Sequence, residues 1–448
     1  MTRLSQVRRA QDREILRLAV PAFLALVAEP MFLLSDAAIV GHLGTPELAG
    51  LGIAGVVLQT VVGLCVFLAY GTTAGVARRL GAGDRRGALA QGVDGLWLAV
   101  IIGVVATALG IATTGPLVAA FDASPAVTEH ATTYLRIAFL GTTPLLLMLA
   151  ATGVLRGLQD TRTPLVVAVA GNALNIALNL LLVYGVGPVA GLGLPGSALG
   201  SVLAQVASAA ALLFVVIRGA RREGASLRPH PAGIRAAGRS GVPLVIRTLT
   251  LRAALLVTTY AVTLGAVDAV DSSVDLATHQ LAITLWTFLA FVLDAIAIAA
   301  QAITGRLLGS GDTEETRAVT RRMVQWGVGS GVVTGLLLAA GSPLLGRLFT
   351  TDPAVRDALV PVLVVAALAQ PIAGVVFVLD GVLIGAGDGS YLARGGLVTL
   401  VVYAPVVLLV AGGGLVAVWV SFAFLFMGAR LVVLVHRARG EAWLVTGA

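Results

Sequence analysis

Hydrophobic residues occur in long runs along this chain, separated by short segments rich in arginine, glycine and proline. A helix needs about 20 apolar residues to cross a membrane. Twelve runs reach this length, and the pattern predicts an all-α integral membrane protein with twelve transmembrane helices. We expect these helices near residues 15–41, 47–77, 88–112, 128–152, 163–186, 195–217, 241–266, 277–305, 318–340, 356–383, 392–411 and 413–435.

The composition supports a membrane protein and excludes several other classes. Charged residues make up 12% of the 448 positions and hydrophobic residues 58%, with a mean hydropathy of +0.96; soluble domains carry about a quarter charged residues. The net charge of +7 does not indicate a nucleic-acid partner, because the basic residues form short clusters between apolar runs. The single cysteine and the lack of ATP-binding or metal-binding motifs predict no cofactor, no metal site and no enzymatic activity.

The arginine distribution predicts the orientation in the membrane. All thirty basic residues are arginine, and 25 of them lie in the N-terminus, in the connections after even-numbered helices or in the C-terminal tail. The connections after odd-numbered helices hold only Arg347 and Arg356. Positive charge stays in the cytoplasm, so both termini are expected there. The arginine-only, alanine-rich composition is typical of a GC-rich bacterial genome, and the inner membrane is the expected location.

An internal repeat divides the chain into two halves. Residues 78–84 match residues 306–312, and Gly153-Val154-Leu155-Arg156-Gly157 matches Gly381-Val382-Leu383-Ile384-Gly385, both at a shift of 228 positions. Six helices per repeat make the halves parallel, with a pseudo-two-fold axis along the membrane normal, as in many transporters. We therefore expect an N-lobe at 1–217, a cytoplasmic linker at 218–240 and a C-lobe at 241–448.

Asp36 is the leading candidate for a functional residue. It lies well inside the first apolar run, where an ionisable side chain costs at least about 2.5–3.5 kcal/mol. Glu29 precedes it by two helical turns, and Pro30 removes a backbone hydrogen bond, which allows the helix to bend. A buried carboxyl could gain and lose a proton near neutral pH. The alternative is a structural carboxyl that caps the backbone or pairs with an arginine.

Polar side chains on other helices are candidates for the same kind of site. Asn172, Asn175 and Asn179 form one stripe on the fifth helix and could hydrogen-bond Asp36 in either protonation state; they could equally hold helices together. In the C-lobe, Asp294 is the nearest candidate partner for an arginine of helix 7, and Asp380 is either a second ionisable site or an interfacial residue. The full second group is Glu29, Gln205, Arg247, Arg252, Tyr260, Asp294, Gln301 and Asp380.

Several motifs together resemble one transporter family. They are Glu29-Pro30 and Ser35-Asp36-Ala37 in the first helix, Gly41-His42-Leu43-Gly44 after it, residues 153–161, and residues 294–301 in the eighth helix. These segments are similar to those of the MATE (multidrug and toxic compound extrusion) family, and specifically to its DinF-like branch.

The resemblance implies two six-helix lobes that open alternately to either side of the membrane. It implies proton- or sodium-driven export of small amphipathic, often cationic compounds, with Asp36, Asn175 and Asn179 at the family's polar positions. Many relatives carry Asp where this chain has Asn179, which disfavours sodium because hard cations prefer charged oxygen ligands. We therefore expect proton antiport by a monomer. The alternatives are sodium antiport, a flippase for lipid-linked precursors and an intramembrane enzyme.

Overall fold

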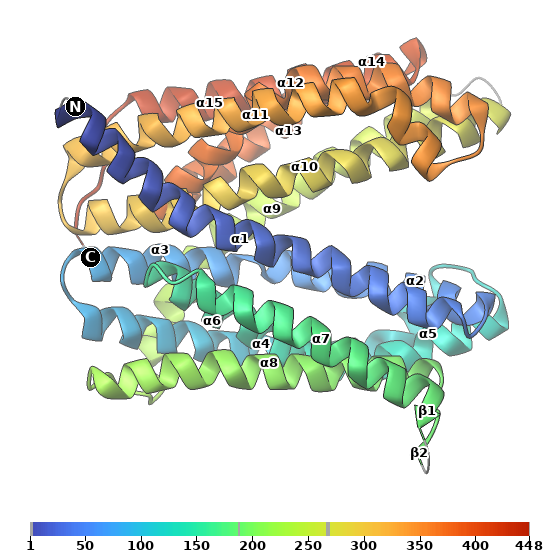
Figure 1. The fold of residues 1–448 in the computed structure, drawn as a ribbon, viewed down its shortest axis with the longest axis horizontal. Helices are drawn as coiled ribbons and strands as arrows, with labels where there is room; N and C mark the ends of the chain where they lie inside the picture. The colour runs from blue at the N-terminus through green and yellow to red at the C-terminus, as the bar shows by residue number, and fades with distance from the viewer. Residues whose placement is uncertain (1–2, 187–188, 266–268, 448) are drawn as a thin grey trace. The chain divides into compact units, whose positions relative to one another are not determined.

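The computed structural model describes residues 3–186, 189–265 and 269–447 and is almost entirely helical (Figure 1). The α-helices are α1 (Arg3–Gly41), α2 (Thr45–Cys65), α3 (Phe67–Gly81), α4 (Arg85–Ala119), α5 (Pro125–Ala138), α6 (Thr142–Gly157), α7 (Arg162–Tyr184), α8 (Leu194–Arg222), α9 (Pro231–Gly265), α10 (Ala269–Gly309), α11 (Thr313–Phe349), α12 (Pro353–Gly385), α13 (Gly389–Leu409), α14 (Gly414–Val420) and α15 (Met427–Arg439). The 3₁₀ turns are η1 (Phe139–Gly141) and η2 (Ala411–Gly413), and η3 (Ser421–Phe426) is π-helical. Strands β1 (Gly185–Val186) and β2 (Val189–Ala190) form a small antiparallel hairpin after α7.

The prediction of twelve membrane spans is confirmed. Among the described residues, twelve helical segments are long and apolar enough to cross a membrane, and each overlaps one predicted run. Some spans contain more than one helix: α2 and α3 together form the second, and α5, η1 and α6 form the fourth. The first span is longer than predicted, because α1 already begins at Arg3. Both the predicted run and α1 end at residue 41, so Asp36 lies five residues before the end of the helix.

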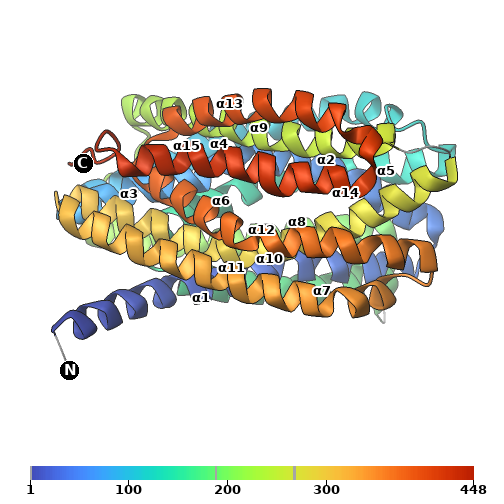
Figure 2. The same cartoon turned by 90° about the horizontal axis from the view of Figure 1, so that it is seen from above.

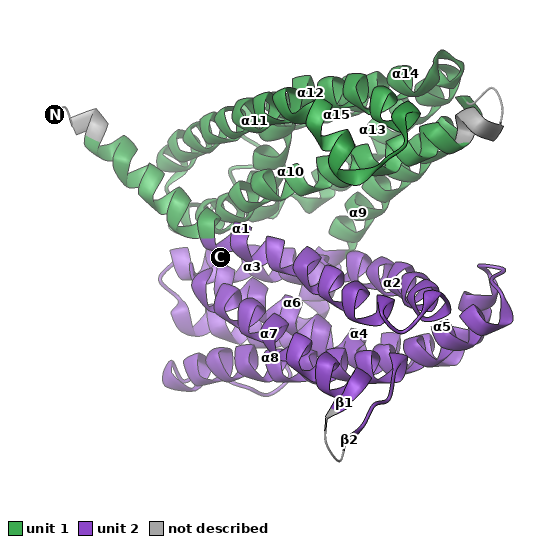
Figure 3. Cartoon of the chain, turned by 45° about the vertical axis from the view of Figure 1, so that its right-hand side comes forward, with its two compact units in different colours: residues 1–20, 242–447 green, residues 21–241, 448 purple. Residues whose placement is uncertain are grey.

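The chain forms two compact units, coloured separately in Figure 3. Unit 1 contains residues 1–20 and 242–447, and unit 2 contains residues 21–241. These boundaries differ from the expected lobes at both ends, because the start of α1 groups with the C-terminal half and residues 218–241 group with the N-terminal half. The cause is local: in unit 1, Arg322 on α11 donates to both carboxylate oxygens of Asp12 on α1, at 2.6 and 2.7 Å.

The segment that leads into α9 is held in unit 2 by hydrogen bonds to α4. Trp97 Nε1 on α4 donates to the Leu227 carbonyl at 3.0 Å, and the backbone N–H of His230 donates to Asp94 at 3.3 Å. The segment expected as the cytoplasmic linker is therefore packed against α4.

The sequence repeat corresponds to a repeated turn. Gly83 and Gly311 have positive φ angles of 78° and 82°, which glycine adopts without strain. The next residues, Asp84 and Asp312, then cap α4 and α11 by accepting hydrogen bonds from the backbone N–H of Gly87 (2.7 Å) and Glu315 (2.8 Å). A glycine followed by a capping aspartate thus ends one helix and begins the next in each unit.

The second repeated motif permits close helix packing. A Cβ atom at Gly153 on α6 would lie 2.6 Å from the Ala69 carbonyl oxygen, and one at Gly381 on α12 would lie 2.4 Å from the Ala297 carbonyl oxygen. Ala69 and Ala297 are themselves related by the shift of the repeat. The same glycine therefore brings two helix backbones together in each unit, as small residues do in membrane bundles.

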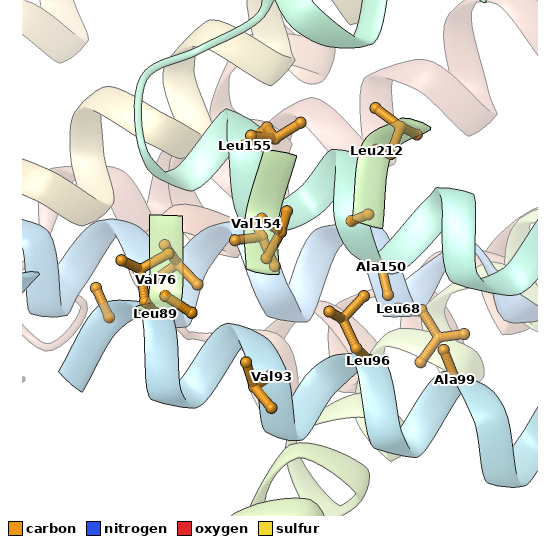
Figure 4. Packing of buried hydrophobic residues seen from close by; sticks show 14 of the residues in the cluster. Leu68, Val76, Leu89, Val93, Leu96, Ala99, Ala150, Val154, Leu155 and Leu212 are labelled. Atoms are coloured by element: carbon orange, nitrogen blue, oxygen red, sulfur yellow. The ribbon is translucent and has the colours of Figure 1, made fainter. Parts of the chain in front are cut away.

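Each unit packs its own apolar core. In unit 2, side chains from α3, α4, α6 and α8 interlock around Val76, Leu89, Val154 and Leu212 (Figure 4). In unit 1, α12 packs against both α10 and α11, and the three helices run side by side (Figures 1 and 2). The packed helices of each unit surround the few polar side chains inside it.

Candidate functional site

Asp36 lies at the centre of a buried polar network in unit 2. The network joins α1, α7 and α8, and Asp36 is only 3% exposed within it. Asn179 Nδ2 donates to one carboxylate oxygen, and Ser201 Oγ donates to the other at 3.2 Å. Asn175 supports both donors, because its Nδ2 donates to Ser201 Oγ at 3.0 Å and its Oδ1 lies 3.4 Å from Asn179 Nδ2. The helix stripe predicted from the asparagine spacing thus reaches Asp36.

The groups around Asp36 are neutral. No ion pair found among the described residues includes Asp36, so the carboxyl is not held by a guanidinium there. Asn179 Oδ1 and Ser197 Oγ are buried acceptors without a hydrogen-bond partner in the described part of the chain. An amide and hydroxyls can serve a carboxylate or a carboxylic acid equally, since each can donate or accept. The arrangement is therefore compatible with proton uptake and release.

Two further elements of this site were not predicted from the sequence. Ser197 and Ser201 lie one helical turn apart on α8, and Tyr134 on α5 is buried next to them, close enough to Asp36 for an electrostatic effect. The i, i+4 spacing of the two serines, which Gln205 continues on the same face of α8, was the signal that could have identified this helix as part of the site.

Asn172 does not join the Asp36 network. Its Nδ2 donates to the Ala28 carbonyl at 2.6 Å, two residues before Pro30. Pro30 has no N–H to offer the carbonyl of Leu26, so the backbone hydrogen-bond ladder of α1 is already weakened in this turn. Asn172 is thus a contact of the proline segment, and the expectation of three asparagines around Asp36 reduces to two.

Unit 1 contains a separate cluster of buried charges. Asp380 on α12 pairs with Arg247 on α9 and with Arg430 on α15, the latter at 3.5 Å. The three side chains are 8%, 14% and 11% exposed, so the cluster is buried within unit 1. The sequence suggested Asp294 as the nearest partner for an arginine of α9. The structure places the Asp380 carboxyl against Arg247. Asp294 lies close enough to Arg430 to act on it electrostatically.

The remaining sequence candidates are scattered. Gln301 is buried at 3% exposure, Gln205 is half-buried against Gly141, and Asp294 is half-buried. Three others are exposed: Glu29, Arg252 and Tyr260, the last at 58%. None of these six joins the hydrogen bonds drawn to Asp36 among the described residues.

A family model described as MatE matches residues 21–181 and again residues 249–409. The chain belongs to the MatE family. The starts and the ends of the two matched segments are separated by the same shift as the internal repeat. Proteins of this family are transporters, not enzymes, and the family resemblance of the helix motifs is confirmed.

Relatives and solved structures agree with this assignment. Protein DETOXIFICATION 44, chloroplastic, of Arabidopsis thaliana is 32% identical over 94% of this chain and 80% of its own length. DNA damage-inducible protein F of Escherichia coli is 28% identical over 92% of this chain and 89% of its own length. A solved structure of a multidrug resistance MATE family transporter in an outward-facing conformation is 21% identical, covers 99% of both chains and gives a TM-score of 0.86.

The double match also shows where the MatE repeat has diverged. Asp36 and Asn179 correspond, at the shift of the repeat, to Leu264 and Val407. Tyr134 corresponds to Val362. The Asp36 carboxyl and its Asn179 partner therefore occur in one half of the repeat only, whereas Asn175 corresponds to Tyr403, which is also polar.

Proposed function

We propose that this MatE protein exports small amphipathic, often cationic compounds in exchange for protons. The observation that carries the proposal is the buried Asp36 carboxyl, which is surrounded by neutral donors and acceptors. The names of relatives support the substrate class: one is a probable multidrug resistance protein of Thermotoga maritima, and another is a plant DETOXIFICATION protein. The arginine-only composition supports a bacterial inner membrane, and the distribution of the arginines supports a cytoplasmic location for both termini.

The proposed cycle follows alternating access. With Asp36 ionised, the network offers a negative charge that favours an organic cation. A proton from the outside then adds to a carboxylate oxygen, the negative charge disappears, and the cation is released outside. Asn179 and Ser201 keep a hydrogen-bonded position for the carboxyl in both states, so the exchange does not require the network to be dismantled.

The segment around Pro30 is the proposed conformational element. Pro30 lies six residues before Asp36 on α1, and Asn172 on α7 binds the carbonyl of Ala28 in the same turn. A change in the Asp36 network can reach this weakened turn along two routes, through α1 itself and through α7. We propose that protonation favours a bend of α1 there.

Sodium coupling is the second candidate, and the oxygen-rich site gives it some basis. A sodium ion could be coordinated by the Asp36 carboxylate, Asn179 Oδ1 and Ser197 Oγ. The amide and hydroxyl oxygens of this set have no hydrogen-bond partner in the described residues. Only one of these atoms belongs to a carboxylate, whereas hard cations favour charged ligands. For this reason protons are preferred. The flippase alternative has weaker support, because Arg247 and Arg430 already face Asp380.

The test is transport by purified protein in liposomes with an imposed gradient. We expect a pH gradient, with the acidic compartment on the side that receives the dye, to drive export of a cationic dye without sodium, and Asp36→Asn to abolish this export. Glu129→Gln is the matched control, because it removes a carboxyl of α5 that lies outside the Asp36 network. Export that requires a sodium gradient would support the second candidate, and proton-driven export by Asp36→Asn at the wild-type level would refute the role of Asp36.

A further inference from the structure

His279 is a buried histidine that the mechanism above does not use. It lies on α10 in unit 1, is 3% exposed, and its Nε2 is 3.1 Å from Thr259 Oγ1 on α9. The Thr259 hydroxyl donates its single proton to the Leu255 carbonyl at 3.1 Å. The imidazole must therefore donate from Nε2, and this leaves the Nδ1 lone pair as an acceptor.

That acceptor is unsatisfied, and so are two polar atoms near it in the same unit. His279 Nδ1, Trp419 Nε1 and Thr278 Oγ1 are all buried without a hydrogen-bond partner among the described residues. The rings of His279 and Trp419 have centroids 5.7 Å apart and are inclined at 59°. Buried polar groups in membrane interiors are normally paired, so an unpaired basic nitrogen beside an indole ring indicates a ligand.

We propose that His279 is a second proton-binding site, with its imidazolium form held against the indole ring of Trp419. This proposal rests on the proposed proton antiport and adds a second proton to it. The incoming proton bonds to the Nδ1 lone pair, no bond breaks, and the charge on the imidazole rises by one. The positive ring then lies within the roughly 6 Å at which an aromatic ring attracts a cation, and Nε2–H keeps its bond to Thr259.

Few ionisable side chains on the neighbouring elements could bind the proton in place of His279. On α10, Asp275 lies one turn earlier, and on α9, Tyr260 follows Thr259 but is 58% exposed. Helix α14, which carries Trp419, has no titratable side chain. Among the described residues His279 takes part in no ion pair. Its proton affinity therefore depends on burial, Thr259, the indole ring and the nearby Asp275.

The position of His279 along its helix suits proton entry from outside. It lies six residues after the start of the eighth membrane span at Ser273, and Asp36 lies five residues before the end of the first span at Gly41. In the proposed orientation both of these span ends face outward. At a rise of 1.5 Å per residue, each group lies about 8–9 Å along its helix from that end.

A second proton changes the electrical balance of transport. Exchange of one proton for one monovalent organic cation moves no net charge. Exchange of two protons moves one positive charge inward, so that a membrane potential drives export. A potential of 100 mV contributes about 2.3 kcal/mol per charge, which corresponds to an accumulation ratio of about 50-fold.

The first experiment observes the proton directly. In ¹⁵N-histidine-labelled protein in lipid nanodiscs, His279→Gln identifies one of the five histidine signals by its loss. We expect that signal to show the Nε2–H tautomer at high pH and to convert to imidazolium as the pH is lowered. His436→Gln, near the C-terminal end of α15, should remove a different signal. A His279 signal that stays neutral down to the lowest pH at which the protein remains folded overturns the proposal.

The second experiment measures the charge moved. The liposomes are held at a clamped potential that drives positive charge inward, with no pH gradient. Under these conditions wild-type protein should export a monovalent cationic dye, and His279→Gln should not. With a pH gradient instead, His279→Gln should still export the dye. Potential-driven export by His279→Gln at the wild-type level overturns the proposal. Because glutamine could disturb folding, Trp419→Phe, which keeps an aromatic ring, should retain the response, and Trp419→Leu should lose it.

The outcomes separate this inference from the proposed function. If Asp36→Asn keeps proton-driven export while the His279 signal titrates, the proposed role of Asp36 fails and the second site stands. If Asp36→Asn loses export and His279 does not titrate, the proposed role of Asp36 stands and the second proton site fails.

Discussion

The charge cluster around Asp380 gives the most quantitative prediction. Asp380→Asn removes one buried carboxylate from between two arginines but preserves the size of the side chain. The guanidinium groups of Arg247 and Arg430 then lose their common counter-charge in a region where both arginine side chains are largely buried. Removing one partner of a buried ion pair costs about 3–5 kcal/mol, mostly because the remaining charge is left uncompensated.

The size of the shift follows from the size of the folding unit. For units of about 150–250 residues, 1 kcal/mol changes the melting temperature by about 2–4 °C. Asp380→Asn should therefore lower the melting temperature by about 10 °C, measured by thermal unfolding of purified protein in detergent. Asp380→Asn combined with Arg430→Met removes one of the two buried arginine charges and should recover about 1 kcal/mol or more of the loss.

The matched control is Glu441→Gln. Glu441 pairs with Arg317 at 2.8 Å, but the two side chains are 83% and 47% exposed, so this pair contributes less than about 1 kcal/mol. If Asp380→Asn unfolds at a free energy within about 1 kcal/mol of wild type, the cluster does not stabilise unit 1 as argued. If the variant is stable but has lost proton-driven export, Asp380 is an ion-coupling residue instead.

Three further predictions concern the fold and the bend. Gly153→Leu should prevent folding or cost several kcal/mol of stability, because a Cβ there would lie 2.6 Å from the Ala69 carbonyl oxygen. The measurement is the yield and melting temperature of the variant. The control is Gly329→Ala, at a position with open space, which should match wild type in both. Asp312→Ala removes the cap of α11 and should cost about 1 kcal/mol in thermal unfolding, and an unchanged melting temperature would contradict the capping role. Pro30→Ala restores an N–H to α1 and should reduce dye export without lowering the melting temperature; full export would refute the proposed bend.

The fold was predictable because membrane thickness and repetition leave strong signals in the sequence. A run of about 20 apolar residues has few alternatives to a spanning helix. The internal repeat was equally readable, since a glycine with positive φ and a capping aspartate are required at each of the two matching turns. The division of α1 and α9 between the units was not readable, because it depends on contacts such as Asp12 with Arg322, 310 residues apart.

The candidate site was predictable only in part. Helical spacing places Asn175 and Asn179 on one face, and burial cost singles out Asp36. Spacing cannot tell which neighbouring helix faces that stripe, so Ser201 on α8, 165 residues from Asp36, was missed. The same limit applies to Asp380, whose partners lie 133 and 50 residues away.

The two halves share a scaffold but differ in their polar chemistry, and this difference bears on how transport is coupled. Asp36 corresponds to Leu264, while in the other direction His279 corresponds to Leu51 and Arg247 to Ala19. Each of these three ionisable residues therefore lies at a position where the other half is apolar. If both halves bound a proton at equivalent sites, symmetry would give the sites similar affinities. A carboxyl in one unit and an imidazole in the other instead respond oppositely, since protonation neutralises Asp36 but charges His279. If both proposals hold, each proton makes the charge of its unit one step more positive, and a more positive protein binds a cationic substrate less tightly.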